Sequence, residues 1–167
     1  MEALRIAGVI VAESDEVLHC RYFGPLLDLG SSYHRDLEKR VCTQVDESSS
    51  IVDDFIVVRH KENDLCVYIL GGADCAEVVL RNAVATLFDA FEGSPLQNLS
   101  KETFEQNLSY FMVAVDELFD DGYVFETSAA NLKKKIQIKS ELLPIIDMSI
   151  GDVLSKAKTS FFKSLLQ

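Results

Sequence analysis

The sequence predicts an α/β fold of the α+β type, in which helices cover both faces of a five-stranded antiparallel sheet and form three layers with it. Residues 4–12 are apolar at nearly every position, which is typical of a strand buried on both faces. Two pairs of β-rich runs are each joined by a short polar segment, which indicates antiparallel hairpins. Several longer segments carry apolar residues at the 3.6-residue period of a helix. The 167 residues form one domain of ordinary size.

The first hairpin is expected from strands at residues 4–12 and 17–23, with a polar turn between them. Gly24 and Pro25 end the second strand. A helix capped by serines follows, because apolar residues recur there four positions apart. Its apolar positions are Leu37, Val41 and Val45.

A second hairpin is expected at residues 55–59 and 65–70, after a polar break at residues 46–50. The residues between its strands, 60–64, have the composition of a turn. A long helix is expected to begin near Cys75 and to end before Pro95. The predicted sheet so far contains four strands.

The most regular helical pattern begins after Ser100, which is a predicted N-cap. Its apolar positions are Phe104, Leu108, Phe111, Met112, Val115, Leu118 and Phe119. Gly122 is expected to end this helix in a left-handed conformation, and a fifth strand is expected at residues 123–126. A helix carrying Leu132 and Ile136 then follows Ser128.

The last predicted element is an amphipathic helix at residues 149–166, where Ser149 and Asp152 have the spacing of a capping box. We therefore expect a main domain at residues 1–148, which this helix, within residues 149–167, extends. Two aromatic and two leucine side chains lie near its end. Packing within the chain and contact with a partner explain them equally well. These candidate interface residues are Phe161, Phe162, Leu165 and Leu166.

Charge and composition exclude several classes of protein. The net charge of −11 argues against a nucleic-acid-binding protein, because phosphate contacts need a basic surface. Residues 1–130 hold 24 acidic and 9 basic residues, whereas residues 131–167 hold 7 lysines and 3 acids. No apolar run is long enough to span a membrane, and the N-terminus lacks a signal-peptide pattern, so a cytoplasmic protein is expected. The four cysteines form no C-x-x-C pair, and neither a metal site nor a cofactor is predicted.

The sequence contains no set of residues that predicts catalysis. His19 is next to Cys20, but neighbouring strand residues point to opposite faces, so this pair makes a poor catalytic dyad. His34 and His60 are expected on a helix surface and in a turn. The glycine pair at 71–72 lacks the remaining residues of a phosphate-binding loop. No enzyme is predicted.

Two charged clusters leave alternatives open. The acids at positions 116–117 and 120–121 match no cation-binding loop, and they lie where the helix dipole disfavours them. Specific hydrogen bonds in a turn and a solvated corner explain them equally well. The lysines at 133–135, with Lys139, form either a solvated helix face or a site for acidic lipid or protein.

Residues 111–127, FMVAVDELFDDGYVFET, resemble the A-V-D-E-x-x-x-x-G-x-[VI]-x-E-[ST] segment of the small chains of adaptor and coatomer complexes, which share the longin-like fold. The matching signature residues are Asp116, Glu117, Gly122, Glu126 and Thr127. In that family they are expected to hold the fold together.

Within this family the chain resembles the zeta chains of the COPI coatomer more than the sigma chains of clathrin adaptors. The similar segments are MEAL at 1–4, NAVATLFDA at 82–90 and the C-terminal helix, which sigma chains generally lack. The resemblance implies a non-catalytic coat subunit that pairs with the trunk solenoid of the gamma large subunit and joins the other coatomer subunits. It also implies a location on the cytoplasmic side of the Golgi membrane and on COPI vesicles, with membrane contact only through the coat and its small GTPase. A sigma-type adaptor chain and a longin-type GTPase regulator are the alternatives.

Overall fold

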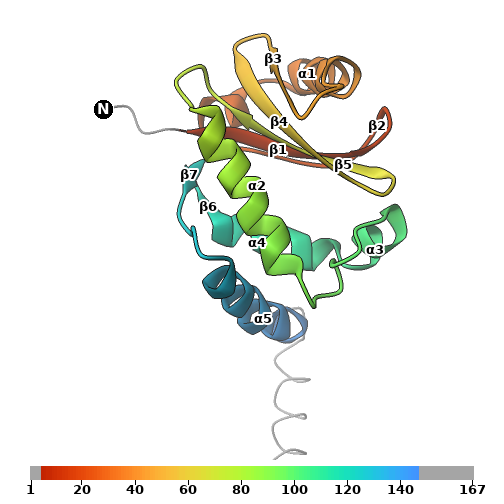
Figure 1. Ribbon diagram of the computed structural model, residues 1–167, viewed down its shortest axis with the longest axis vertical. Helices are drawn as coiled ribbons and strands as arrows, with labels where there is room; N and C mark the ends of the chain where they lie inside the picture. Colours follow the sequence, from red (N-terminus) through yellow and green to blue (C-terminus); the bar gives the residue numbers. More distant parts are fainter. Residues whose placement is uncertain (1–4, 147–167) are drawn as a thin grey trace, which may run out of the picture.

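A single antiparallel sheet of five strands forms the centre of the structure, a computed structural model that describes residues 5–146 (Figure 1). The strands are β1 (Ile6–Glu13), β2 (Glu16–Tyr22), β3 (Ser49–Val52), β4 (Phe55–Glu62) and β5 (Leu65–Gly71). Their order in the sheet is β2-β1-β5-β4-β3, and each neighbouring pair is antiparallel. The predicted five-stranded antiparallel sheet and both predicted hairpins are confirmed.

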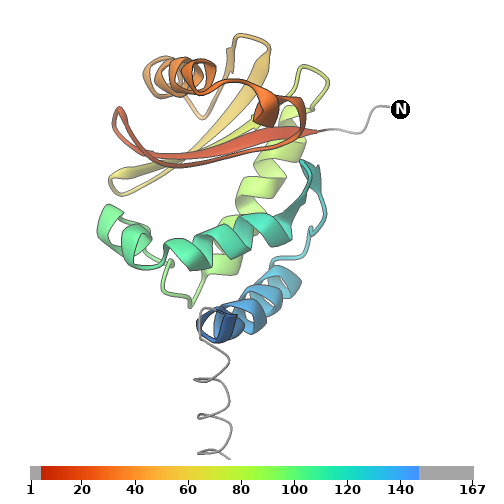
Figure 2. The same ribbon diagram turned by 180° about the vertical axis from the view of Figure 1, so that it is seen from behind.

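Helices cover both faces of this sheet, as predicted. They are the short 3-10 helix η1 (Gly24–Asp28), α1 (Ser31–Gln44), α2 (Glu77–Phe91), α3 (Lys101–Gln106), α4 (Leu108–Leu118) and α5 (Ala129–Ile146). Helix α1 lies on one face, and α2 and α4 lie on the other (Figures 1 and 2). Helix α5 packs against α2 and α4, on the side away from the sheet. The helix predicted at residues 149–166 lies outside the described residues.

Each face of the sheet has its own hydrophobic core. In β1, the side chains of Val9, Ile10, Val11 and Ala12 are all fully buried and alternate between the two cores. Every residue of β5 is buried as well. Because β1 and β5 face apolar side chains on both sides, the apolar run at residues 6–12 is explained. The larger core, under α2 and α4, contains a cluster of packed aromatic rings, including Phe104 and Phe111 with centroids 5.1 Å apart.

The fifth strand is not where the sequence analysis placed it. It is β3, which falls at the end of the predicted polar break and pairs with β4 through a two-residue turn. Tyr123 and Val124 instead form β7 (Tyr123–Val124), which pairs with β6 (Phe119–Asp120) in a separate two-stranded ribbon. The correction has a physical reason: a short edge strand is defined by its partner, and a serine-rich segment carries little β propensity of its own.

The helix predicted after Ser100 is two helices. Ser100 does cap α3, since its hydroxyl accepts the Thr103 N–H at 3.2 Å in a capping box. The chain then leaves helical geometry at Asn107, whose φ is −123° and ψ 28°. The Asn107 side-chain amide donates to the Thr103 carbonyl at 2.8 Å, and the Asn107 backbone N–H also donates to it at 3.1 Å, so local hydrogen bonds hold this break. The 3.6-residue spacing of apolar side chains continues across this break, so the sequence pattern alone predicted one helix.

His60 was also misplaced, because β4 continues through Glu62 and the turn comes only at Asn63 and Asp64. Asn63 has a φ of 54°, a left-handed conformation that asparagine tolerates. The helix expected near Cys75 begins at Glu77. The remaining predicted elements of the described residues are found within a few residues of their expected bounds.

Candidate functional site

The signature segment forms a tight corner that closes against the start of β1. Asp121 and Gly122 have φ values of 44° and 84°, and they connect β6 to β7 as a type I′ hairpin turn, for which Asp-Gly is a preferred pair. The Gly122 carbonyl accepts the Ile6 N–H at 2.6 Å. A Cβ atom at position 122 would lie 2.4 Å from the Ile6 carbonyl oxygen, so only glycine fits. Gly122 therefore does not end α4, which stops at Leu118.

Arg5 fixes the same corner from the other side. Its guanidinium donates to the Asp121 carboxylate at 2.5 Å and to the Asp121 carbonyl at 3.1 Å. It also lies over the Tyr123 ring, 5.2 Å from the centroid. The first strand and the signature corner are thus joined by backbone and side-chain contacts between residues 116 positions apart.

Two signature glutamates hold α5 against the rest of the domain. Glu117, at the end of α4, forms an ion pair with Lys139, and Glu126 forms one with Lys135 at 2.9 Å. The Glu126 carboxylate also accepts the backbone N–H of Ser128 at 2.9 Å, just before α5 begins. This backbone hydrogen bond, followed by the Lys135 ammonium, lowers the pKa of Glu126 below its usual value. Both glutamate side chains are only 13% exposed, so these pairs are better shielded than ordinary surface ion pairs.

The other two signature residues make weaker contacts. Asp116 pairs with Arg21 of β2 at 3.3 Å, with both side chains about half exposed. The Thr127 carbonyl accepts a long hydrogen bond from the Thr86 hydroxyl of α2 at 3.4 Å. Of the two explanations for the acidic cluster, specific bonding holds for Asp116, Glu117 and Asp121.

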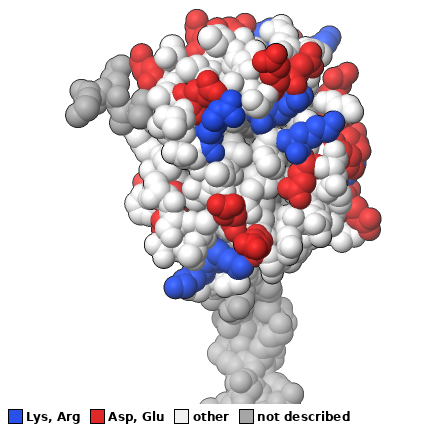
Figure 3. Space-filling model, in the orientation of Figure 1, with Lys and Arg blue, Asp and Glu red and all other residues white. Residues whose placement is uncertain are grey.

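The lysine run is largely engaged within the chain. Lys135 and Lys139 pair with the two glutamates, and Lys135 also lies 4.8 Å from the centroid of the Phe125 ring. The Lys133 ammonium donates to the Glu92 carbonyl, after the end of α2. On the face drawn in Figure 3, basic side chains lie beside acidic ones and form no continuous patch. These contacts hold three lysines of the run, Lys133, Lys135 and Lys139, against the rest of the domain.

The histidines lie apart and have different surroundings. His19 packs between the rings of Phe104 and Phe111, and burial lowers its pKa. His34 stacks on Tyr22, and His60 lies against Phe88. Within residues 5–146, no group of His, Cys, Asp and Glu side chains is placed to hold a metal ion. Over the same range, no helix has both the length and the apolar character needed to cross a membrane.

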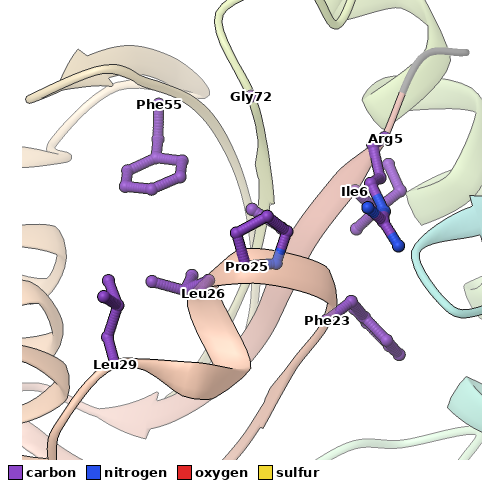
Figure 4. A pocket seen from close by; sticks show the side chains of 9 residues that line it. Arg5, Ile6, Phe23, Pro25, Leu26, Leu29, Phe55 and Gly72 are labelled. Atoms are coloured by element: carbon purple, nitrogen blue, oxygen red, sulfur yellow. The ribbon is translucent and has the colours of Figure 1, made fainter. Parts of the chain in front are cut away.

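Sequence reasoning missed a pocket beside η1. Its volume is about 290 Å³, and apolar side chains from β1, η1 and the start of β4 form most of its wall (Figure 4). Leu26 and Phe55 face it from opposite sides, and Leu29 lies at its edge. The one available signal was the apolar content of residues 25–29, directly after a predicted strand end. The candidate interface residues Phe161, Phe162, Leu165 and Leu166 lie outside the described residues.

The fold is also found in a chain of an adaptor complex. It superposes on a chain in a homology model of the full-length AP-3 complex in a stretched open conformation, with a TM-score of 0.66 and 10% sequence identity. The superposition covers 85% of this chain and 97% of the AP-3 chain. At that identity the likeness establishes the fold alone. No protein-family model matches the sequence.

Curated proteins with similar sequences include coatomer zeta subunits. The chain is 25% identical to coatomer subunit zeta-1 of Bos taurus over 124 residues, which cover 74% of this chain and 70% of the relative. It is 27% identical to coatomer subunit zeta-1 of Arabidopsis thaliana over 146 residues, 82% of each chain, and 24% identical to the probable zeta-A subunit of Dictyostelium discoideum over 120 residues. The resemblance to zeta chains is thereby confirmed, since the chain is similar to coatomer zeta subunits over most of its length.

Proposed function

We propose that this chain is the zeta-type small subunit of a COPI vesicle coat, which acts in Golgi-to-ER retrograde and intra-Golgi transport. The observation that carries this proposal is the alignment with zeta subunits from animals, a plant and an amoeba over most of the chain. The adaptor-type fold supports it independently of sequence identity. In this role the chain is a non-catalytic subunit on the cytoplasmic face of the Golgi membrane and on COPI vesicles.

The expected partner is the trunk solenoid of the gamma large subunit, in an obligate heterodimer that joins the other coatomer subunits. Contact with the membrane is then indirect, through the coat and its small GTPase. The five signature residues act structurally in this proposal. Gly122 accepts the first N–H of β1, and Glu117 and Glu126 pair with lysines of α5, while Asp116 and Thr127 make weaker contacts with β2 and α2. The interface is proposed to include Phe161, Phe162, Leu165 and Leu166, near the C-terminal end of the sequence.

Affinity purification of the tagged full-length chain from its own cytosol tests this proposal. Large coat subunits of the coatomer set should copurify at fixed stoichiometry. A Phe161→Asp variant should recover less of the large subunit, while circular dichroism shows that it is folded. Recovery with clathrin-adaptor large chains would instead identify a sigma-type chain. A chain that brings no large subunit and accelerates nucleotide exchange on a GTPase would refute both assignments.

A further inference from the structure

Two hollows lie on either side of Phe23 and η1, and together they form one continuous surface. The first is the apolar pocket of about 290 Å³, with Leu26, Leu29 and Phe55 in its wall (Figure 4). This volume is at the lower limit of ligand pockets, about 300 Å³, so it suits one or two apolar side chains better than a cofactor. Leu29 is 43% exposed, a large fraction for a leucine at the edge of such a pocket.

The second hollow, of about 350 Å³, is acidic and lies beside the signature corner. Its wall includes Asp116, Asp120 and Asp121, together with Leu27, which is 60% exposed. Phe23 lines both hollows. The Arg5–Asp121 ion pair also joins them, because Arg5 lines the first and Asp121 the second. A segment of a few residues can therefore contact both.

The charges of this surface select the kind of occupant. Asp116 and Asp121 are each paired with one arginine, whereas Asp120 and the exposed Asp28 of η1 form no ion pair with the described side chains, those of residues 5–140. Both arginines near the hollows, Arg5 and Arg21, are already engaged. A lysine or arginine of a partner therefore meets free carboxylates here, while an acidic partner is repelled.

We propose that this surface binds a segment of a partner protein in which an apolar side chain adjoins lysine or arginine. We call it the η1 surface and define it by Phe23, Leu26, Leu27, Leu29, Asp116 and Asp120. The apolar side chain enters the pocket between Leu26 and Phe55, and the basic side chain reaches Asp120. The proposal goes beyond the coat role, since it rests on this surface and holds whichever large subunit copurifies.

Fluorescence anisotropy with the full-length chain tests the proposal. The probe is a labelled peptide, GSKLRLKSG, compared with the acidic peptide GSELELESG and the serine peptide GSKSRSKSG. We expect the first peptide to bind at least about tenfold more tightly than either of the others, a difference of roughly 1.4 kcal/mol. Binding should weaken as salt rises from about 0.05 M to about 0.5 M, because the basic contact is screened.

Matched variants separate this surface from a general acidic surface. Leu29→Ser and Asp120→Asn should each weaken binding of the basic peptide several-fold. Two control variants change an exposed apolar residue and an exposed acid elsewhere: Ile51→Ser on β3 and Asp74→Asn. Both should bind the basic peptide as tightly as the unaltered chain does. Equal binding by all four variants, or tighter binding of the acidic peptide, would overturn the proposal. Self-association that Leu29→Ser abolishes, without peptide binding, would overturn it as well, since a second copy would then be the occupant.

Discussion

Replacing Gly122 by alanine tests the role of the signature corner in stability. The left-handed conformation costs an alanine about 1 kcal/mol relative to glycine. The added Cβ, 2.4 Å from the Ile6 carbonyl oxygen, must also push the start of β1 away, and such overpacking costs about 2 kcal/mol. Losing the Ile6–Gly122 hydrogen bond adds about 1 kcal/mol. The variant should be less stable by about 4 kcal/mol, and its Tm should fall by about 10 °C for a domain of this size.

Urea unfolding followed by circular dichroism measures this loss, with Gly72→Ala as the matched control. Gly72 directly follows β5 and donates its N–H to the Arg5 carbonyl, but an added Cβ there has no neighbour within 4 Å. Its substitution should change the free energy of unfolding by less than about 1 kcal/mol. If the two variants are equally stable, the close approach of Gly122 to Ile6 does not exist in solution, and the structural role of the corner is refuted.

Two further substitutions test the core and the attachment of α5. Phe111→Ala should lower the free energy of unfolding in urea by about 4 kcal/mol, because the fully buried ring packs against other aromatic rings. Met112→Ala, at a half-exposed neighbouring position, should lower it by less than about 1 kcal/mol. Equal losses would contradict the orientation of α4. Because the pKa of Glu126 is lowered in the folded state, its ionised carboxylate stabilises the fold at pH values above the ordinary pKa of 4.5. This stabilisation is lost as the pH falls through the lowered pKa. The stability difference between wild type and Glu126→Gln should therefore be present at neutral pH and shrink toward about pH 3, and a pH-independent difference would contradict the ion-pair and capping role.

The strand β1 could be recognised from its apolar residues at 6–12, because a strand buried on both faces needs apolar side chains at successive positions. The corner at Gly122, in contrast, could not be recognised from the sequence. Acids followed by glycine are compatible with a helix C-cap and with a hairpin turn, and only the contact with Ile6 selects the turn. The ordered pair of Glu117 and Lys139 was equally hidden, since the two residues are 22 positions apart and sequence patterns report mainly neighbours within a helical turn.

The pocket beside η1 could not be predicted either. Its walls come from β1, η1 and the beginning of β4, and a cavity depends on how these elements are placed relative to one another. Residues 25–29 showed only that apolar side chains follow a strand end. Even the exposed positions of Leu27 and Leu29 follow from the fold, because η1 buries Leu26 and turns its neighbours outward.

The hydrogen bond from Ile6 to Gly122 also constrains the order in which the chain can fold during synthesis. β1 can pair with β2 and β5 once residues up to Gly71 have left the ribosome, so the central part of the sheet can assemble early. The first amide of β1, however, finds its acceptor only after residue 122 has been made. Until then this amide lacks its acceptor, although Ile6 already lies opposite Gly71 of β5, and the missing bond requires a contact between residues far apart in the chain, which is a slow type of step. The new chain therefore completes the hydrogen bonding of its first strand only after α4 has been made.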